Sequence, residues 1–291
     1  MILKKEISSK SVEWIVPANT VDKDYVLGHF LNSFYSFENH RQIFVFKGGT
    51  CLRKCYFPDY RFSEDLDFTL LDKSFLIDKS FLEKIATHCE TATGIRFWVS
   101  SIENKRSRGE DKGYKCVIYF WGANHSRNEV PPPKERWHTK IEIDISFDEE
   151  ILSPLTHTKI IHLYSDQDKI SASEIPVYSL TEILMEKVRA FYQRSYKAPR
   201  DFYDVWYLLN NVSFENWESI SAMLQKKCAF KNKVIDTSIF RDEAILKLVS
   251  RSWNSSIAHH LPQHKLPELN EVWTYLNEHL FVKFLQLEDK L

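Results

Sequence analysis

The sequence predicts an α/β (α+β) fold in which a core with a mixed β-sheet, residues 1–175, is followed by a helical domain, residues 176–291. Short apolar and alternating runs of the kind that form strands occur before residue 175. After Pro176 the apolar residues recur at helical spacing. With 291 residues and 43% hydrophobic content, the chain can bury one large core or two modest ones.

The first predicted strand, Ile43 to Phe46, is a short continuous apolar run, which is typical of a buried strand. It ends at Gly48-Gly49, which predicts a turn into a helix that begins at about Thr50. A later run, Lys115 to Trp121, also has strand character.

Two further segments, Glu64 to Leu70 and Lys140 to Phe147, alternate strictly between polar and apolar residues, which is typical of half-buried strands. Their polar faces consist of Asp65, Asp67 and Thr69 in the first segment, and of Lys140, Glu142, Asp144 and Ser146 in the second. We therefore expect acidic side chains on one face of the sheet.

The second domain begins with a sequence signature for a helix start. Ser179 and Glu182 have the spacing of a capping box, and Leu180, Ile183, Leu184, Val188 and Phe191 follow as an apolar stripe. A second helix is predicted to start near Pro199, with Phe202, Val205, Trp206 and Leu209 as its buried stripe. The remainder of the chain is predicted to be helical.

Composition excludes several classes of protein. Lys+Arg 39 against Asp+Glu 40 gives a net charge of -1, so contact with nucleic acid requires a local basic patch. Five cysteines without a C-x-x-C pair argue against a disulfide framework and fit a reducing cytoplasm. Residues 1–14 lack the apolar core of a signal peptide, and the chain lacks an apolar run long enough for a membrane helix. We therefore expect a cytoplasmic protein without membrane contact.

Asp65 and Asp67 are the first candidate catalytic residues. At positions i and i+2 of one strand they project side by side, roughly 6 to 7 Å apart, and at an effective dielectric near 20 they repel by about 2.5 kcal/mol. A bound divalent cation would offset this repulsion, because both carboxylates could be its ligands. Asp144 is the candidate for a third carboxylate ligand, and Glu142 is the alternative. An acidic, solvent-facing strand without function is the competing interpretation.

The turn at Gly48-Gly49-Thr50 is the candidate phosphate-binding element. Paired glycines permit close approach of the backbone, and a new helix offers free N–H groups to phosphate. Lys187 lies within the apolar stripe of its helix, where a lysine needs a partner or an opening to solvent. It is predicted either to neutralise a triphosphate or to extend to solvent. Asp201 and Asp204 are candidates to orient Lys187 or Arg194, or to contact the nucleotide. Alternatively, they only interact favourably with the dipole at the start of their helix.

The densest basic cluster comprises Lys105, Arg106, Arg108, Lys112 and Lys115, in what is predicted to be a hairpin loop. The first four are candidate contacts to an RNA backbone, although basic loops are commonly just solvated. The eleven histidines show no metal-ligand spacing in the sequence.

Five separated motifs follow one another between Phe46 and Leu209. They are Gly48-Gly49-Thr50, Arg61-Phe62-Ser63-Glu64-Asp65-Leu66-Asp67-Phe68, Ile143-Asp144-Ile145, Glu186-Lys187-Val188-Arg189-Ala190 with Arg194, and Pro199-Arg200-Asp201-Phe202-Tyr203-Asp204. In this order they resemble the motifs of the AbiEii/MenT-type nucleotidyltransferase toxins, which belong to the DNA-polymerase-β-like superfamily. The 14 residues between Thr50 and Asp65 exceed the minimal spacing of that superfamily and imply an enlarged loop.

The resemblance implies a toxin of a toxin–antitoxin or abortive-infection system that transfers NMP from NTP to an acceptor hydroxyl, with a tRNA 3′ end as the favoured acceptor and a separate antitoxin as partner. Mg²⁺ or Mn²⁺ would be held by Asp65, Asp67 and Asp144, with Lys187 as a further catalytic residue. The nucleotide, in a cleft between the two domains, would contact Gly48, Gly49, Thr50, Arg61, Ser63, Lys187 and Asp204.

Two alternatives remain at this point. The acceptor could be a small molecule or a protein, because no motif defines the acceptor site. The chain could also be a non-catalytic module that binds nucleic acid or docks an antitoxin, although the intact acidic residues argue against a decayed enzyme.

Overall fold

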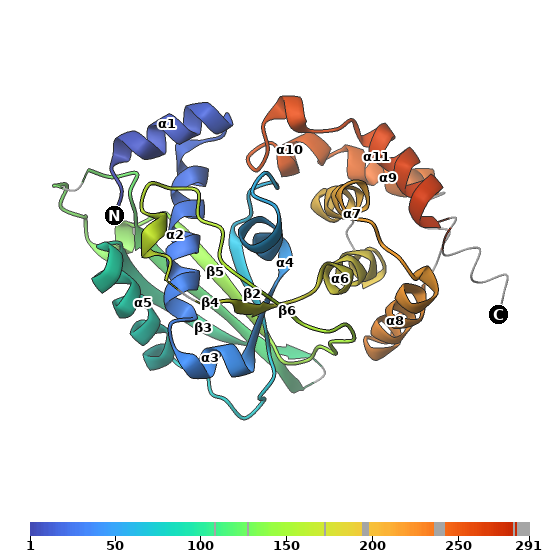
Figure 1. The fold of residues 1–291 in the computed structure, drawn as a ribbon, viewed down its shortest axis with the longest axis horizontal. Helices are drawn as coiled ribbons and strands as arrows, with labels where there is room; N and C mark the ends of the chain where they lie inside the picture. The colour runs from blue at the N-terminus through green and yellow to red at the C-terminus, as the bar shows by residue number, and fades with distance from the viewer. Residues whose placement is uncertain are drawn as a thin grey trace. The chain divides into compact units, whose positions relative to one another are not determined.

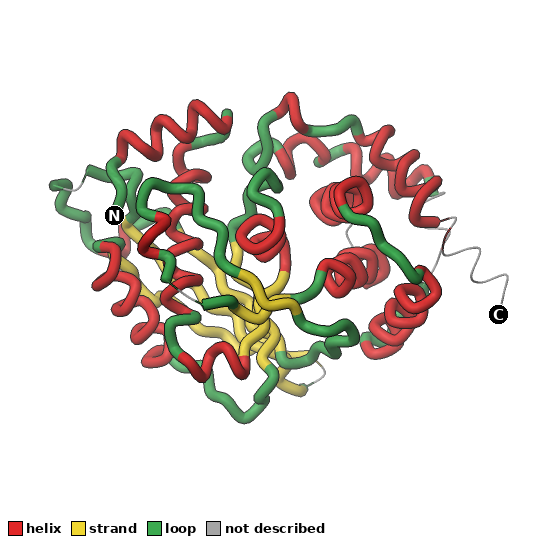
Figure 2. The backbone as a smooth tube through the Cα atoms, viewed as in Figure 1, coloured by secondary structure: helices red, strands yellow, loops and turns green. Residues whose placement is uncertain are grey.

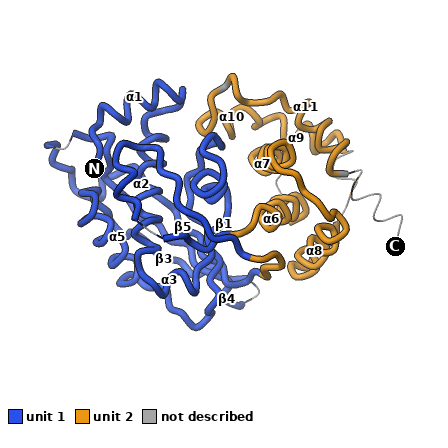
Figure 3. Tube along the Cα trace, viewed as in Figure 1, with its two compact units in different colours: residues 1–149, 155–177 blue, residues 150–154, 178–291 orange. Residues whose placement is uncertain are grey.

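The structure is a computed structural model that describes residues 1–107, 109–126, 128–171, 173–193, 198–235, 242–281 and 283. The chain forms two compact units (Figure 3). Unit 1 comprises residues 1–149 and 155–177, and unit 2 comprises residues 150–154 and 178–291. The chain passes into unit 2 for the last time after residue 177, whereas the boundary was predicted after residue 175, and residues 150–154, predicted in the first domain, belong to unit 2.

Seven strands of the described chain form one mixed sheet in unit 1, in the order β3-β4-β5-β2-β1-β7-β6 (Figure 1). Their bounds are β1 Phe44–Lys47, β2 Asp65–Leu70, β3 Arg96–Ser107, β4 Glu110–Trp121, β5 Lys140–Ser146, β6 Thr156–Thr158 and β7 Ile175–Val177. Strand β2 pairs antiparallel with β1 and parallel with β5, which places it inside the sheet. The predicted mixed sheet is confirmed.

The helical segments of unit 1 are α1 Lys4–Trp14, α2 Ala18–Phe34, α3 Glu38–Ile43, α4 Gly48–Cys51, η1 Leu52–Tyr56, α5 Lys79–Thr93, η2 Lys134–Arg136 and η3 Gln167–Lys169. Helix α2 packs on the sheet, because the ring of Phe34 stacks on Phe68 of β2 with centroids 4.4 Å apart. Phe30 of the same helix meets Phe97 of β3 at 5.5 Å.

The packing of α2 decides which way the acidic residues of the sheet point. The apolar residues of the two acidic strands, Leu66, Phe68, Ile141, Ile143 and Ile145, are fully buried. Because successive side chains of a strand point to opposite faces, the carboxylates project away from this core. The alternation ends early in β2, where Thr69 is buried rather than part of an open polar face.

Unit 2 is helical (Figure 2), as predicted. Its described segments are α6 Leu180–Gln193, α7 Pro199–Asn211, α8 Trp217–Phe230, α9 Glu243–Ser250, α10 Trp253–Ile257, η5 Gln263–Lys265, α11 Leu269–Leu276 and η6 Asn277–Phe281. Phe191 of α6 stacks on Phe202 of α7 at 4.4 Å, and Phe202 meets Trp273 of α11 at 5.8 Å. The predicted apolar stripes of α6 and α7 therefore form part of the core of this unit.

The capping box at the start of α6 forms only in part. The Glu182 N–H donates to Ser179 Oγ at 3.1 Å, as predicted. The Glu182 carboxylate instead accepts N–H groups from Leu152 and Ser153 and pairs with Lys227 at 2.6 Å. The Lys227 ammonium and two backbone N–H groups thus bind the carboxylate that would otherwise cap the helix.

Candidate active site

The pairing of β2 with β5 brings the three predicted catalytic carboxylates onto one face of the sheet. Asp67 is the register partner of Asp144, and Asp65 is the partner of Glu142. Neighbouring strands lie about 4.8 Å apart, so the side chains of a parallel pair project side by side. All four acidic residues are half-buried. The strand order thus joins residues that are far apart in the sequence.

Lysines neutralise two of these carboxylates. Lys105 of β3 contacts Asp144 at 2.6 and 2.9 Å. Lys115 and Lys140 contact the Glu142 carboxylate at 2.7 and 2.6 Å. The hydrogen bond from Lys115, followed by that from Lys140, lowers the pKa of Glu142 to about 2. Glu142 is therefore committed to two lysines on its own sheet, and Asp144 is the better candidate ligand.

The turn after β1 lies directly against Asp67. Lys47, the last residue of β1, is the register partner of Asp67. Gly48 follows with a φ of 80°, and a Cβ atom there would lie 2.1 Å from Asp67 Oδ2. Both the positive φ and the close approach require glycine. The helix therefore begins at Gly48, two residues before the predicted start at Thr50, with its first turn beside the carboxylate.

Two further predicted nucleotide-binding residues, Arg61 and Ser63, border the same turn. A Cβ atom on Gly49 would lie 3.0 Å from Ser63 Oγ and 3.1 Å from Arg61 Nη2. Thr50 donates its hydroxyl to the backbone oxygen of Asp65 at 2.5 Å, which ties the helix to β2. The structure thus brings together, within unit 1, all the predicted residues of the turn and its neighbouring loop.

A buried ion cluster behind the turn was missed by the sequence reasoning. Asp24 of α2 accepts from Arg53 Nε at 2.7 Å and from Lys54 Nζ at 2.7 Å. Burial opposes ionisation of this carboxyl, but Arg53 and Lys54 hold the pKa of Asp24 well below its usual range. The cluster anchors η1, which continues the helix from Gly48. Two basic residues inside an otherwise buried helix were the available signal in the sequence.

The residues of this face fit a divalent cation. Hard cations take carboxylate oxygens together with phosphate oxygens, and Asp65, Asp67 and Asp144 offer carboxylates from adjacent strands. Lys105 already places a positive charge on Asp144. The absence of a Cβ at Gly48 leaves room for Asp67 beside the backbone of the turn.

Lys187 belongs to unit 2, where it has acidic partners. Its ammonium lies 2.7 Å from Asp204 Oδ2 and 3.3 Å from Asp201 Oδ1, and its side chain is 16% exposed. The prediction that these aspartates orient Lys187 is consistent with the contacts, whereas a lysine that simply extends to solvent is not. Arg194, the other basic residue considered there, lies outside the described residues.

The basic cluster is not in a loop, contrary to the prediction. Lys105 and Arg106 are in β3 and Lys112 is in β4, because the two strands continue to Ser107 and Glu110. Arg106 pairs with Asp111 at 2.7 Å, and Lys112 pairs with Glu110 at 2.8 Å and with Asp148 at 3.2 Å. Arg108 lies outside the described residues. Acidic neighbours thus balance much of the predicted positive patch.

The chain belongs to the family of AbiEii nucleotidyl transferase toxins of type IV toxin–antitoxin systems, whose model matches residues 29–277. The protein is therefore a nucleotidyltransferase toxin, as the resemblance of the motifs implied. A search of curated proteins found no match. In the described part of the chain, no helix is both long and apolar enough to span a membrane.

Solved structures share the fold over nearly the whole chain. JHP933 from Helicobacter pylori is 16% identical with a TM-score of 0.57, over 94% of this chain and 96% of its own. The nucleotidyltransferase toxin MenT4 from Mycobacterium tuberculosis is 15% identical with a TM-score of 0.56, over 99% of each chain. At this level of identity the likeness supports the fold alone.

Proposed function

We propose that the protein transfers a nucleoside monophosphate from an NTP, with Mg²⁺ or Mn²⁺, to an acceptor hydroxyl and releases pyrophosphate. The observation that carries the proposal is the parallel register of Asp67 with Asp144, with Gly48 in contact with the first of them. Carboxylates and the backbone N–H groups of a helix start are thereby concentrated at one place on the sheet, which is what a nucleotide with a divalent cation requires.

Asp65, Asp67 and Asp144 would hold the cation. When bound, it would supply positive charge to the α-phosphate and lower the pKa of the attacking hydroxyl. Asp144 is the carboxylate best placed to accept a proton from that hydroxyl, because Glu142 is held by Lys115 and Lys140. Lys105 must leave Asp144 before Asp144 can take part.

The turn would orient the phosphates. Its N–H groups at Gly48, Gly49 and Thr50 lie at a helix start, where the helix dipole favours anions. Arg61 and Ser63 border the backbone of Gly49 and would contact the phosphates from the other side. The anchoring of η1 through Arg53 keeps this turn in place, and such preorganisation is what makes charge stabilisation effective.

In unit 2, Lys187 would add a charge to the triphosphate. Asp204 is fully buried and fixes the ammonium at 2.7 Å, so little side-chain entropy would be lost on binding. Asp204 would then contribute to nucleotide binding by positioning this lysine.

The acceptor would be RNA, and a tRNA 3′ end in particular, with Lys105, Arg106, Arg108 and Lys112 as phosphate contacts. Three of these residues line the β3–β4 hairpin, whose strand β3 also reaches Asp144 through Lys105. Membership of a toxin family further implies an antitoxin partner.

The test is incubation of the purified protein with each α-labelled NTP, Mg²⁺ and total cellular RNA. We expect labelled RNA of tRNA size with the wild type, none with Asp67→Asn, and full labelling with Asp59→Asn, which changes an exposed aspartate outside the site. If the label were found on the protein or on a small molecule instead, that molecule and not RNA would be the acceptor. Failure to transfer any label from any NTP would overturn the proposed reaction.

A further inference from the structure

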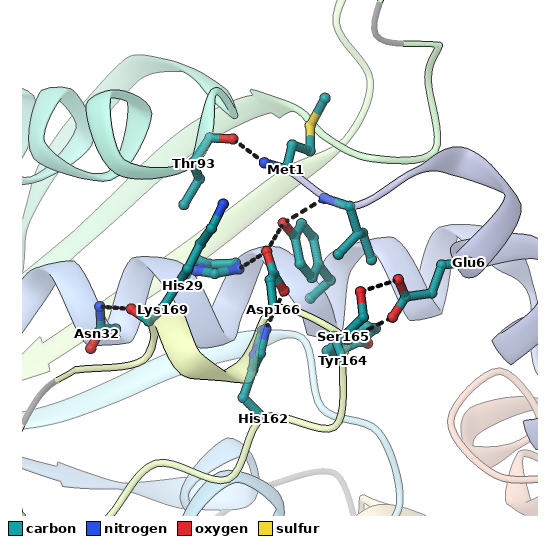
Figure 4. A network of polar contacts seen from close by, with 12 residues as sticks. Met1, Glu6, His29, Asn32, Thr93, His162, Tyr164, Ser165, Asp166 and Lys169 are labelled. Atoms are coloured by element: carbon teal, nitrogen blue, oxygen red, sulfur yellow. Dashed lines mark hydrogen bonds and ion pairs between the residues drawn. The ribbon is translucent and has the colours of Figure 1, made fainter.

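Three side chains in unit 1 that no motif connects converge in the core. His29 lies in α2, and His162 and Asp166 lie in the segment between β6 and η3 (Figure 4). The side chains of both histidines are 1% exposed and that of Asp166 is 11% exposed. Because 133 residues separate the two histidines, the cluster has no short spacing that the sequence could have shown.

The distances from the two histidines to Asp166 match the spacing of neighbouring ligand atoms in a metal site. His29 Nε2 lies 3.3 Å from Asp166 Oδ2, and His162 Nε2 lies 3.3 Å from Asp166 Oδ1. One ligand atom from each of the three residues lies within 4.8 Å of the others. A tetrahedral zinc ion with bonds of about 2.0 to 2.1 Å separates neighbouring ligand atoms by about 3.3 Å.

The hydrogen bonding of the imidazoles is incomplete. Within the described residues, His162 Nδ1 is buried and has no hydrogen-bond partner. His29 Nε2 is also buried, and although it lies 3.3 Å from Asp166 Oδ2, the contact does not have the geometry of a hydrogen bond. Buried polar groups almost always have one, and each exception needs an explanation. At His29 the unsatisfied atom is the one that faces Asp166, so a cation between them would satisfy it.

Gly28 indicates that the space for His162 is built into α2. A Cβ atom on this residue would lie 2.5 Å from His162 Nδ1, so another residue would displace the imidazole. Glycine within a helix is less stabilising than alanine, because it loses more backbone freedom on folding. Helix α2 therefore has a residue of low helix propensity at the position where the His162 imidazole packs against it.

The carboxylate is also oriented by a second layer of contacts. Tyr25 donates its hydroxyl to Asp166 Oδ2 at 3.0 Å and accepts the backbone N–H of Ile2 at 3.1 Å. Carboxylates that ligate metals are commonly held by such hydrogen bonds, which fix the direction of the oxygens.

We propose that His29, His162 and Asp166 form a binding site for one transition-metal cation of the zinc class, separate from the carboxylates on the sheet. Two imidazoles and one carboxylate suit Zn²⁺ and related ions, whereas Mg²⁺ prefers oxygen ligands. The ion joins α2 to the segment 159–166. Ile161 of this segment donates to the backbone oxygen of Lys54 at 2.6 Å, so the ion also supports η1 behind the phosphate-binding turn.

Zinc titration of the chelator-stripped, full-length protein in Mg²⁺-free buffer tests the proposal, with a chromophoric chelator as competitor. We expect one equivalent bound with a dissociation constant below about 1 µM and a rise in Tm of roughly 5 °C. The variant His162→Gln should bind at least about 100-fold more weakly. Replacement of the exposed neighbour, His157→Gln, should leave the affinity unchanged.

A second variant separates this site from the sheet carboxylates. The double variant Asp65→Asn with Asp67→Asn should retain the full equivalent of zinc. The proposal is overturned if zinc binding is absent, if His162→Gln binds as tightly as the wild type, or if the double variant loses the ion. Should His162→Gln fail to fold, X-ray absorption of the zinc-loaded wild type decides the matter, since two imidazole ligands support the site and an all-oxygen shell rejects it.

Discussion

Lysine–carboxylate pairs occur in two very different settings in this protein. On the sheet of unit 1, Lys105 and Asp144 form a pair whose side chains are 44% and 35% exposed. In unit 2, the pair of Lys227 with Glu182 is 1% and 0% exposed, at almost the same distance of 2.6 Å. The two pairs have the same separation of nitrogen and oxygen, but they differ strongly in burial.

Exposure determines whether such a pair can be exchanged. An exposed ion pair contributes about 0 to 1 kcal/mol, so a divalent cation with its nucleotide can displace Lys105 at little cost. A buried pair cannot be opened so readily, because each separated ion would lose both its partner and water. We therefore assign the pairs on the sheet to function and the Lys227 pair to stability, and the following experiments test that assignment.

The largest effect on catalysis is expected at Asp67. Asp67→Asn keeps the shape of the side chain but removes a charge beside Gly48, so transfer should fall by at least about 10³-fold, or about 4 kcal/mol. Thermal stability in Mg²⁺-free buffer should stay the same or rise slightly, because repulsion from Asp65 is relieved. Initial rates with the labelled NTP, together with a melting curve, provide the measurement. Activity above a few per cent of wild type would remove Asp67 from the catalytic site.

The largest effect on stability is expected at Lys227. Its ammonium contacts Glu182, Glu186 and the backbone oxygen of Glu150, and it is 1% exposed. Lys227→Met should reduce the free energy of unfolding by about 3 to 5 kcal/mol, because Glu182 is left buried without its cation.

Urea unfolding of the protein, followed by tryptophan fluorescence, measures that loss. The double variant Lys227→Met with Glu182→Gln is the matched control and should recover part of the stability. If Lys227→Met unfolded at the wild-type urea concentration, the distinction between the two settings would be wrong.

The sequence predicted the sheet more completely than it predicted the contacts of its charged residues. Alternation along β5 was enough to place Asp144 on a polar face, and the glycines were enough to locate the turn after β1. Pairing of β2 with β5 could be expected from the family resemblance but not from the pattern. The lysine on Asp144 comes from a third strand, whose register no local periodicity specifies.

The buried polar clusters were the least predictable part. The pairs Asp24 with Arg53 and His29 with His162 join residues that lie far apart in the sequence. Nothing within a single element indicates the partner of any of them. Local patterns report which face of an element is buried, whereas such clusters depend on tertiary packing. Tertiary packing also explains why the Glu182 carboxylate pairs with Lys227 and does not cap its own helix.

Lys187 is intermediate between the two settings, with 16% exposure and a fully buried partner in Asp204. Lys187→Met should lower NTP turnover by roughly 10²-fold, as expected for loss of one charge that stabilises the transition state. It should also lower Tm, because Asp204 loses its cation. Lys187→Arg keeps the charge and should retain more of both properties. Unchanged kinetics in Lys187→Met at a lowered Tm would assign this residue to stability alone.

Lys105 should show a smaller effect of opposite sign. Lys105→Met removes the ammonium that competes for Asp144, so the Mg²⁺ concentration for half-maximal activity should fall by roughly 3-fold, within the range of an exposed pair. Lys79→Met, which breaks an exposed pair with Glu83 on α5, is the control and should leave the Mg²⁺ dependence unchanged. An increased Mg²⁺ requirement in Lys105→Met would mean that the lysine assists the site rather than competing for it.

The smallest effect is expected on the hairpin, at Arg106. Its side chain is 66% exposed and pairs with Asp111 at 2.7 Å, so an RNA phosphate must compete with that carboxylate. Arg106→Ala should lower the slope of log affinity against log salt by about one and weaken binding of all RNA sequences alike. Asp111→Asn removes the competitor and should strengthen binding, while neither change should alter which NTP is chosen. Filter binding at two salt concentrations measures both variants. If the two variants shifted RNA affinity in the same direction, or not at all, Arg106 would not contact the acceptor. The exposed ion pairs of the hairpin would then differ in role from the pair of Lys105 with Asp144.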